Sequence, residues 1–365
     1  MSTISFFGTL VDTIKAHYEL PEILNVAGLP SLRSHAGDSD SVYQITTKSG
    51  ASYVLRPFRT EIAAAIDLHN QFLHWTERCG FRFMQRIIQT RSGEDFFRSG
   101  EQKWWLSSYI EADPVFEWTK PTWSKEVCEQ SGLALSSLHQ ALRQFVSENP
   151  SVQEKRKGDK SVLCYLEKRL EESFSKSPKF IDQWKLVAPV VSKALMLIRE
   201  NESATEVLSG QLVHGDFHPG NLLFRDGTVV AVIDFEYLNF EDATYDLAYA
   251  LVMFCTDWTD PTDDAQLTSA GREPAYDFGP ICECRDGMID REKLQAFLHG
   301  YLFNRAEFDL TFLIPYMHVA AAICLTWFLE RELEDRTALH FINVVKQLEN
   351  LSTMDISRAI GRASS

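Results

Sequence analysis

Two short apolar runs joined by Asp226-Gly227 constrain the fold of this chain more than any other stretch. The runs, at 222–224 and 229–233, are rich in residues that favour strands, and Asp-Gly supplies the turn conformation of a tight hairpin. We expect the hairpin to bring Asn221, just before its first strand, near Asp234, just after its second. The sequence therefore predicts that polar side chains meet at one end of this hairpin.

Asp216 lies in the loop that precedes the hairpin, so two carboxylates and a carboxamide are expected to converge. Oxygen donors of this kind suit Mg²⁺, which keeps several waters and completes its shell with carboxylate and phosphate oxygens. Taken alone, an Asp-Gly hairpin with carboxylates beside it would be a solvated turn. The additional Asn and His residues make a chance combination much rarer.

The stretch resembles the catalytic core of the protein-kinase-like superfamily, in its small-molecule branch of aminoglycoside phosphotransferases, choline kinases and type II homoserine kinases. Protein kinases carry an Asp five residues before an Asn, and later a metal-binding Asp followed by Phe. Asp216, Asn221 and Asp234-Phe235 repeat this spacing. The run His-Gly-Asp-x-His-x-x-Asn is similar to the small-molecule branch, and Ile-Asp-Phe-Glu-Tyr at 233–237 is similar to choline kinases.

This resemblance implies an enzyme that uses ATP as phosphoryl donor and Mg²⁺ as cofactor. Asp216 would be the catalytic base, and Asn221 and Asp234 would be the metal ligands. Asp246 would be a buried acceptor that braces the catalytic loop.

Three further residues of the motif have less specific roles. His214 is expected to be structural. His218 could close the loop through a backbone contact or touch phosphate. Glu236 stands where protein kinases have Gly, and could bind a second metal, contact substrate or be structural.

The length of 365 residues favours two lobes rather than one compact core. The resemblance implies an α+β, bilobal protein-kinase-like fold. Its small nucleotide-binding lobe (1–110) would hold a five-stranded antiparallel sheet with a helix, and would end in a hinge. Its large lobe (111–365) would be mainly helical, with the catalytic hairpin and the acceptor site. The five strands are expected at 42–47, 52–57, 86–90, 95–98 and 103–109.

Arg56 ends the second of these strands, where kinases of this superfamily carry the Lys that pairs with phosphates; homoserine kinase relatives have Arg there. Because side chains alternate along a strand, Val54 shares its face. Val54 could then cover adenine while the guanidinium reaches the α and β phosphates. The helix expected at 61–76 offers three candidate partners for Arg56, of which the first is preferred: Glu61, Asp67 and His69.

Two other stretches are expected to contact the nucleotide. Residues 104–110 resemble the hinge, so backbone groups of Ser108, Tyr109 and Ile110 would bind the adenine edge. Trp104 and Trp105 in the same run favour core and rim positions over a ligand platform. The small, polar residues at 34–40 could cradle phosphate with their backbone N–H groups.

The net charge of −15 argues against nucleic-acid binding and against an anionic membrane surface. Residues 241–290 hold twelve acidic residues against two arginines, and so carry −10 of that charge. This segment is either a solvated loop or an electrostatic funnel for a cationic acceptor. Four aromatic residues could line the acceptor pocket: Trp258, Tyr301, Tyr316 and Trp327.

Seven scattered cysteines favour reduced thiols and a cytoplasmic protein. Residues 311–329 lack charged side chains and are long enough to be a membrane-spanning candidate, but Pro315 and His318 favour a buried helix. Helical spacing at 4–18 predicts an amphipathic helix that packs on the small lobe rather than a membrane anchor.

The acceptor remains open at this stage. An amino alcohol such as homoserine or choline is favoured, with an aminoglycoside or a sugar as the alternative. Protein Ser/Thr phosphorylation and a non-catalytic nucleotide-binding module are two other readings, and a homodimer is compatible with the sequence.

Overall fold

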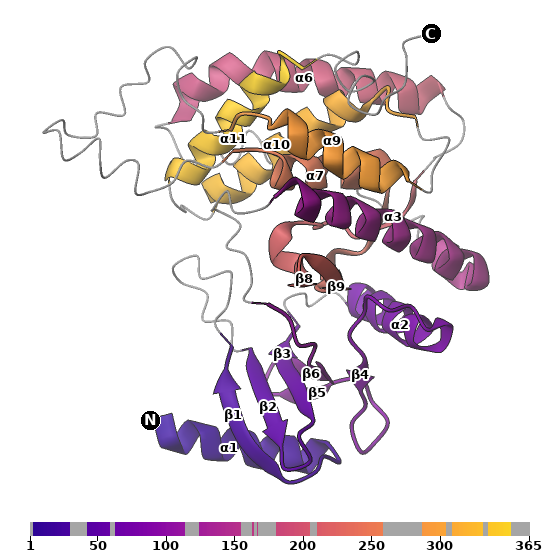
Figure 1. Cartoon of the computed structure of the whole chain (residues 1–365), viewed down its shortest axis with the longest axis vertical. Coiled ribbons are helices and arrows are strands. Elements are labelled where there is room, and N and C mark those ends of the chain that lie inside the picture. The colour runs from indigo at the N-terminus through magenta and orange to yellow at the C-terminus, as the bar shows by residue number, and fades with distance from the viewer. Residues whose placement is uncertain are drawn as a thin grey trace, which may run out of the picture. The chain divides into compact units, whose positions relative to one another are not determined.

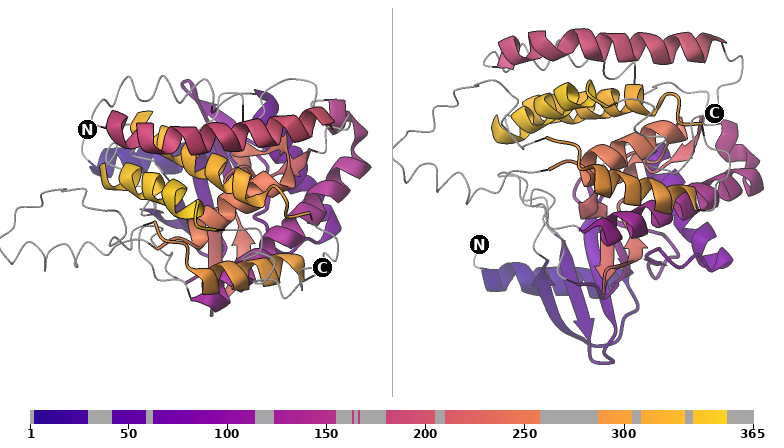
Figure 2. Two further views of the ribbon diagram at one scale, coloured as in Figure 1. Left: turned by 90° about the horizontal axis from the view of Figure 1, so that it is seen from above. Right: turned by 45° about the horizontal axis from the view of Figure 1, so that its top comes forward.

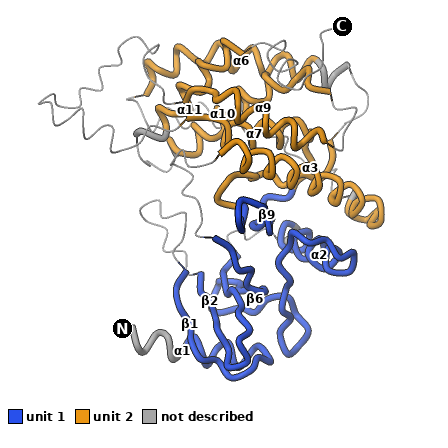
Figure 3. Tube along the Cα trace, viewed as in Figure 1, with its two compact units in different colours: residues 1–115, 222–238 blue, residues 116–221, 239–365 orange. Residues whose placement is uncertain are grey.

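The computed structural model (Figures 1 and 2) describes residues 3–29, 42–58, 63–113, 124–154, 163, 166, 180–204, 210–257, 287–303, 309–330 and 335–351. The chain divides into two compact units (Figure 3). Unit 1 comprises residues 1–115 and 222–238, and unit 2 comprises residues 116–221 and 239–365. The expected hairpin thus groups with the N-terminal residues.

Unit 1 is built on an antiparallel sheet in the order β1-β2-β3-β6-β4, with β5 also paired to β6. The strands are β1 (Ile23–Gly28), β2 (Tyr43–Thr47), β3 (Ser52–Pro57), β4 (Ile87–Ile88), β5 (Phe97–Ser99) and β6 (Gln102–Ser108). The five expected strands are present, and β1 is a sixth that the sequence did not predict. It lies at the sheet edge, where its side chains do not alternate between buried and exposed and Leu24 is 62% exposed.

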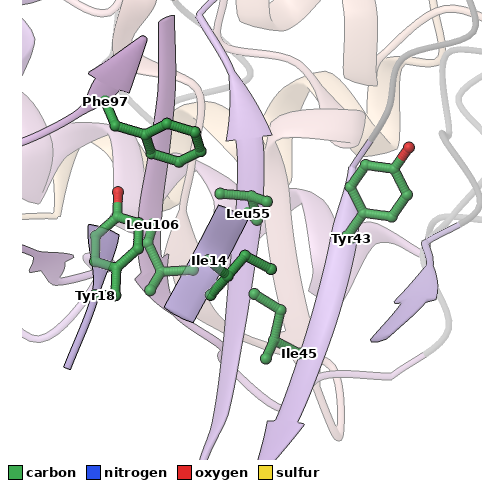
Figure 4. Packing of buried hydrophobic residues seen from close by; sticks show 7 residues of the cluster. All are labelled: Ile14, Tyr18, Tyr43, Ile45, Leu55, Phe97 and Leu106. Carbon is green, nitrogen blue, oxygen red and sulfur yellow. The ribbon is translucent and has the colours of Figure 1, made fainter. Parts of the chain in front are cut away.

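One hydrophobic cluster packs helix α1 (Thr3–His17) against this sheet (Figure 4). Ile14 and Tyr18, from the end of α1 and just beyond it, meet apolar side chains of four strands. The strand residues are Tyr43, Ile45, Leu55, Phe97 and Leu106. The expectation that this helix packs on the small sheet is therefore confirmed.

The predicted hairpin is also confirmed: β8 (Leu222–Arg225) pairs with β9 (Thr228–Val232). Both turn residues have positive φ, 51° at Asp226 and 74° at Gly227, as a tight hairpin turn requires. Backbone hydrogen bonds join the hairpin to the rest of unit 1, from Val232 N to Phe83 O (2.9 Å) and from Asp113 N to Phe224 O (2.7 Å). Helix α2 (Ala63–Cys79) packs on the short helix η4 (Phe235–Tyr237) that follows β9.

Unit 2 is mainly helical. Its helices are α3 (Lys125–Glu148), α4 (Pro150–Glu154), α6 (Ile181–Ala204), α7 (Ala243–Phe254), α9 (Arg291–Leu302), α10 (Leu313–Glu330) and α11 (Asp335–Leu348). Helix α3 packs on α9, and α10 packs on α7, α11 and α6 (Figure 2). The α3–α9 contact is close because both helices present glycine: a Cβ on Gly132 or on Gly300 would come within 2.1 Å of a backbone oxygen of the other helix. A two-stranded ladder of β7 (Gln211–Val213) and β10 (Asn239–Glu241) completes the unit.

Helix α10 corresponds to the uncharged segment at 311–329, and its side chains are largely buried in unit 2, as expected. Among the helices that the structure describes, none has the length and hydropathy that a membrane span requires.

Candidate functional site

The loop between β7 and the short helix η3 (Pro219–Asn221) holds the central motif and is closed by its own hydrogen bonds. The amide of Asp216 donates to His214 Nδ1 (3.2 Å), and the amide of Gly220 donates to His218 Nδ1 (3.0 Å). Asn221 Nδ2 donates to the backbone oxygen of Asp216 (2.8 Å). Both histidines therefore contact loop amides, which fixes the loop locally.

The carboxylate of Asp216 has a hydrogen-bond donor at each oxygen. The Tyr249 hydroxyl donates to Oδ1 at 2.8 Å, and Asn221 Nδ2 lies 3.2 Å from Oδ2. His218 Nε2 lies 3.5 Å from Oδ2. A carboxylate held on both sides keeps its orientation and remains an acceptor for a proton.

Asp246 on α7 anchors the backbone of the same loop. Its Oδ2 accepts from the amide of His214 and its Oδ1 from the amide of Gly215, both at 3.0 Å. His139 Nε2 also donates to Oδ2, at 2.9 Å, and its other ring nitrogen lies 2.9 Å from the Tyr301 hydroxyl. Burial alone raises the pKa of Asp246, but the hydrogen bonds from His139 and His214 outweigh burial and lower the pKa below its usual value. Asp246 is therefore an ionised, buried anchor.

Unit 1 holds a second cluster, made of charged groups. Arg56 Nη2 lies 3.0 Å from Asp234 Oδ1 and 3.0 Å from Glu236 Oε1. The three side chains are 11%, 5% and 2% exposed, and the guanidinium carbon lies 5.5 Å from the Trp105 ring centroid. Buried charges require such pairing, because removing them from water is costly.

These contacts give Arg56 two partners that the sequence did not indicate. Asp67 on α2 is exposed, and Glu61, the preferred candidate, lies outside the described residues. His69 is buried, and burial lowers its pKa to about 4, so it is neutral at neutral pH. Within the described part of the chain, the carboxylates that contact Arg56 lie 178 and 180 residues away from it in sequence.

Two amides of the expected hinge are already hydrogen-bonded within unit 1. Ser108 N donates to Arg86 O (2.9 Å) and Tyr109 N donates to Ser52 O (3.0 Å), so these two amides are used within the sheet. The adenine contact expected for residues 108–110 stays a prediction. Val54 is buried opposite Ser107 in the β3–β6 ladder. Trp105 is buried in the core and Trp104 packs on its edge, which agrees with the core and rim positions expected for this pair.

The expected acceptor aromatics divide into different environments. Tyr301 is fully buried and hydrogen-bonded to His139, so it is a structural residue and does not line a pocket. Tyr316 is 3% exposed and packs edge-on against Tyr245. Trp327 is partly buried. Trp258, most of the acidic segment (258–286) and the expected phosphate loop at 34–40 lie outside the described residues.

The donor atoms present are of the kind that a magnesium–nucleotide complex takes. Asp234 offers carboxylate oxygens, and Asn221 offers its carboxamide oxygen, since its nitrogen donates to Asp216. Mg²⁺ commonly takes only one or two protein ligands beside phosphate and water. In the part of the chain that the structure describes, no group of three or more His, Cys, Asp or Glu residues has a metal-binding arrangement.

Three solved structures that share the fold are distant in sequence. Amicoumacin kinase hAmiN, in complex with AMP-PNP, Ca²⁺ and Ami, matches with a TM-score of 0.59 at 16% identity, over 94% of this chain and 93% of that one. Spectinomycin phosphotransferase APH(9)-Ia, with ADP and its antibiotic, matches with 0.60 at 15% identity, over 94% and 98%. Choline kinase from Cryptosporidium parvum Iowa II matches with 0.59 at 14% identity, over 96% and 97%. These likenesses establish the fold, which is the α+β protein-kinase-like fold expected from the sequence.

The family of this chain follows from a comparison with family models rather than with single proteins. No curated protein sequence matches this chain significantly. The model of the phosphotransferase enzyme family, APH, matches residues 31–281, which is well over half of the chain and includes the whole central motif. This chain therefore belongs to the APH phosphotransferase family, the family of small-molecule kinases that its motif resembles.

Proposed function

We propose that this phosphotransferase transfers the γ-phosphoryl group of ATP to a hydroxyl group of a small amino alcohol, such as homoserine or choline. The observation that carries the proposal is the arrangement around Asp216. Its carboxylate has donors at both oxygens, and the loop backbone beside it is fixed by buried Asp246. Such a group can orient an acceptor hydroxyl and take its proton.

Asp216 is the only base that the proposed transfer requires. The acceptor oxygen forms a bond to the γ-phosphorus as the bond to the β–γ bridging oxygen breaks, and ADP leaves. The hydroxyl proton passes to Asp216. Positioning and charge neutralisation supply most of the catalysis in phosphoryl transfer, since the protein makes no covalent bond to the phosphoryl group.

Asn221 and Asp234 would hold Mg²⁺, which when bound neutralises charge on the β and γ phosphates. Arg56 would reach the α and β phosphates from the end of β3, and its contacts with Asp234 and Glu236 keep it beside the proposed metal ligand. The solved relatives with AMP-PNP and Ca²⁺ or with ADP support a nucleotide donor and a divalent ion.

An amino alcohol is favoured as acceptor for two reasons. The run at 233–237 is similar to choline kinases, and a net charge of −15 attracts cationic molecules. Structures of a choline kinase and of a microcompartment-associated aminopropanol kinase share the fold. Two antibiotic kinases share it equally well, so an aminoglycoside is the second candidate.

A screen for ADP release across amino alcohols, aminoglycosides and sugars tests the proposal, with Asp216→Asn protein as the blank. We expect one amino alcohol to stimulate ADP release many-fold over the blank. Stimulation by an aminoglycoside or a sugar alone would contradict the acceptor class. Label from ATP that enters only the protein would favour a protein kinase. Absence of any ATP turnover, with nucleotide still bound, would favour a non-catalytic module.

A further inference from the structure

Helix α7 contacts three consecutive residues of the catalytic loop with two of its side chains. Asp246 binds the amides of His214 and Gly215, and Tyr249 binds the carboxylate of Asp216. Residues three apart lie on the same face of a helix, so one face of α7 fixes both the loop backbone and its functional side chain. The family motif accounts for Asp246, but it does not include Tyr249.

The contact from Tyr249 is short and comes from a shielded group. Its hydroxyl lies 2.8 Å from Asp216 Oδ1. Burial, followed by the nearby charge of Asp216, raises the pKa of Tyr249 well above its ordinary value of 10. The phenol therefore keeps its proton at any working pH and remains a hydrogen-bond donor.

Two further groups beside this contact are neutral. The Tyr245 ring lies 6.3 Å from that of Tyr249, and burial raises the pKa of Tyr245 well above 10. Cys324 on α10 lies beside Tyr249, and burial raises the pKa of its thiol far above the usual value. The Tyr249 hydroxyl is therefore a neutral donor that fixes the orientation of the carboxylate on the Oδ1 side.

We propose that Tyr249 is a positioning residue that holds Oδ1 of Asp216, and thereby aims the carboxylate at the acceptor hydroxyl. This inference rests on the proposed role of Asp216 as base. Without the phenol, the carboxylate would rotate about its side-chain bonds and present the wrong geometry in part of the population. Because proximity and orientation supply much of the rate in such reactions, the loss should appear in turnover rather than in nucleotide binding.

Tyr249→Phe removes one oxygen atom and keeps the ring. We expect its kcat to fall about tenfold, the size of one hydrogen bond to a charged group, with the KM for ATP unchanged. Tyr245→Phe is the matched control, because it removes the same atom one turn earlier on the same helix. We expect it to keep kcat within about twofold, and both variants to retain the thermal unfolding midpoint of the native protein within a few degrees.

A double-mutant cycle separates positioning from a merely structural role. Turnover is measured for Tyr249→Phe, Asp216→Asn and the double variant, with radiolabelled ATP and long incubations for the slow proteins. We expect Tyr249→Phe to cause little further loss when Asp216 is already Asn. A tenfold loss in both backgrounds, or an unchanged kcat in Tyr249→Phe, would overturn the inference while leaving the function intact. Native turnover in Asp216→Asn would instead overturn the proposed function, and this inference with it.

Discussion

Two regions of the molecule are stabilised by different kinds of interaction. One is the loop of unit 2 that holds Asp216, and the other is the cluster of charged side chains around Arg56 in unit 1. The loop is fixed by backbone amides and neutral donors: Asp246 accepts two amides, and the phenol of Tyr249 holds Asp216. The cluster consists of ion pairs, with one guanidinium nitrogen shared between Asp234 and Glu236. The first arrangement consists of directional hydrogen bonds, whereas the second consists of charges that a metal ion or phosphates can also pair with.

This difference suggests a division of work. A base must keep one orientation through every turnover, and directional hydrogen bonds from a buried anchor provide that. In the proposed function, Asp234 would accept a cation on each cycle, and Arg56 would supply a positive partner that keeps the two buried acids paired when the metal is absent. We therefore expect changes at Asp216 or Asp246 to alter turnover or folding, and changes at Arg56 or Asp234 to alter nucleotide binding.

The largest effect is expected at Asp216. Asp216→Asn removes the proton acceptor but keeps the shape, so turnover should fall by at least about a hundredfold while the fold remains intact. Steady-state ADP release and circular dichroism measure the two quantities. Asp226→Asn is the control, since this exposed hairpin residue has φ of 51°, which Asn tolerates. A near-native rate in Asp216→Asn would remove the base assignment.

Asp246→Asn should mainly reduce stability, by about 2–4 kcal/mol, because a buried ionised partner of His139 and of two amides is lost. Because the pKa of Asp246 is lowered in the folded protein, its ionised carboxylate stabilises the fold at pH values above the usual carboxyl pKa, which is about 4. This stabilisation is lost as the pH falls through the lower pKa of the folded state. Urea unfolding at neutral and acidic pH should therefore show a smaller acid loss in the variant. Asp242→Asn, at the N-cap of the same helix, should change little, because Asn also caps well. Equal acid sensitivity of Asp246→Asn and native protein would argue against this anchor.

The smallest effect is expected from Arg56→Lys. Lysine keeps the charge but loses the planar group that stacks over Trp105, so we expect the MgATP dissociation constant to rise several-fold and stability to fall by about 1 kcal/mol. Calorimetric titration with MgATP measures the affinity. Arg98→Lys, an exposed substitution on β5 of the same sheet, should leave it unchanged. Native affinity for MgATP in Arg56→Lys would contradict the proposed contact between Arg56 and the phosphates.

Local patterns in the sequence were sufficient for some of these features and not for others. The hairpin at Asp226-Gly227 was predictable because its turn chemistry and its strands are adjacent in sequence. Strand β1 was not, because an edge strand with Leu24 exposed shows no alternation. The partners of Arg56 and the contact of Tyr249 with Asp216 join residues far apart in the chain, and no spacing rule indicates them. The resemblance supplied the residue types of the site, and the structure supplied what holds each of them.

The measurement that tests the division of work most directly is the affinity for MgATP of two variants, Asp216→Asn and Asp234→Asn, each compared with the native protein by calorimetric titration. We predict that Asp216→Asn binds MgATP as the native protein does, although it turns over slowly, and that Asp234→Asn binds it at least about tenfold more weakly. Native affinity in Asp234→Asn, or lost affinity in Asp216→Asn, would contradict the assignment of metal binding to Asp234 and of proton transfer to Asp216.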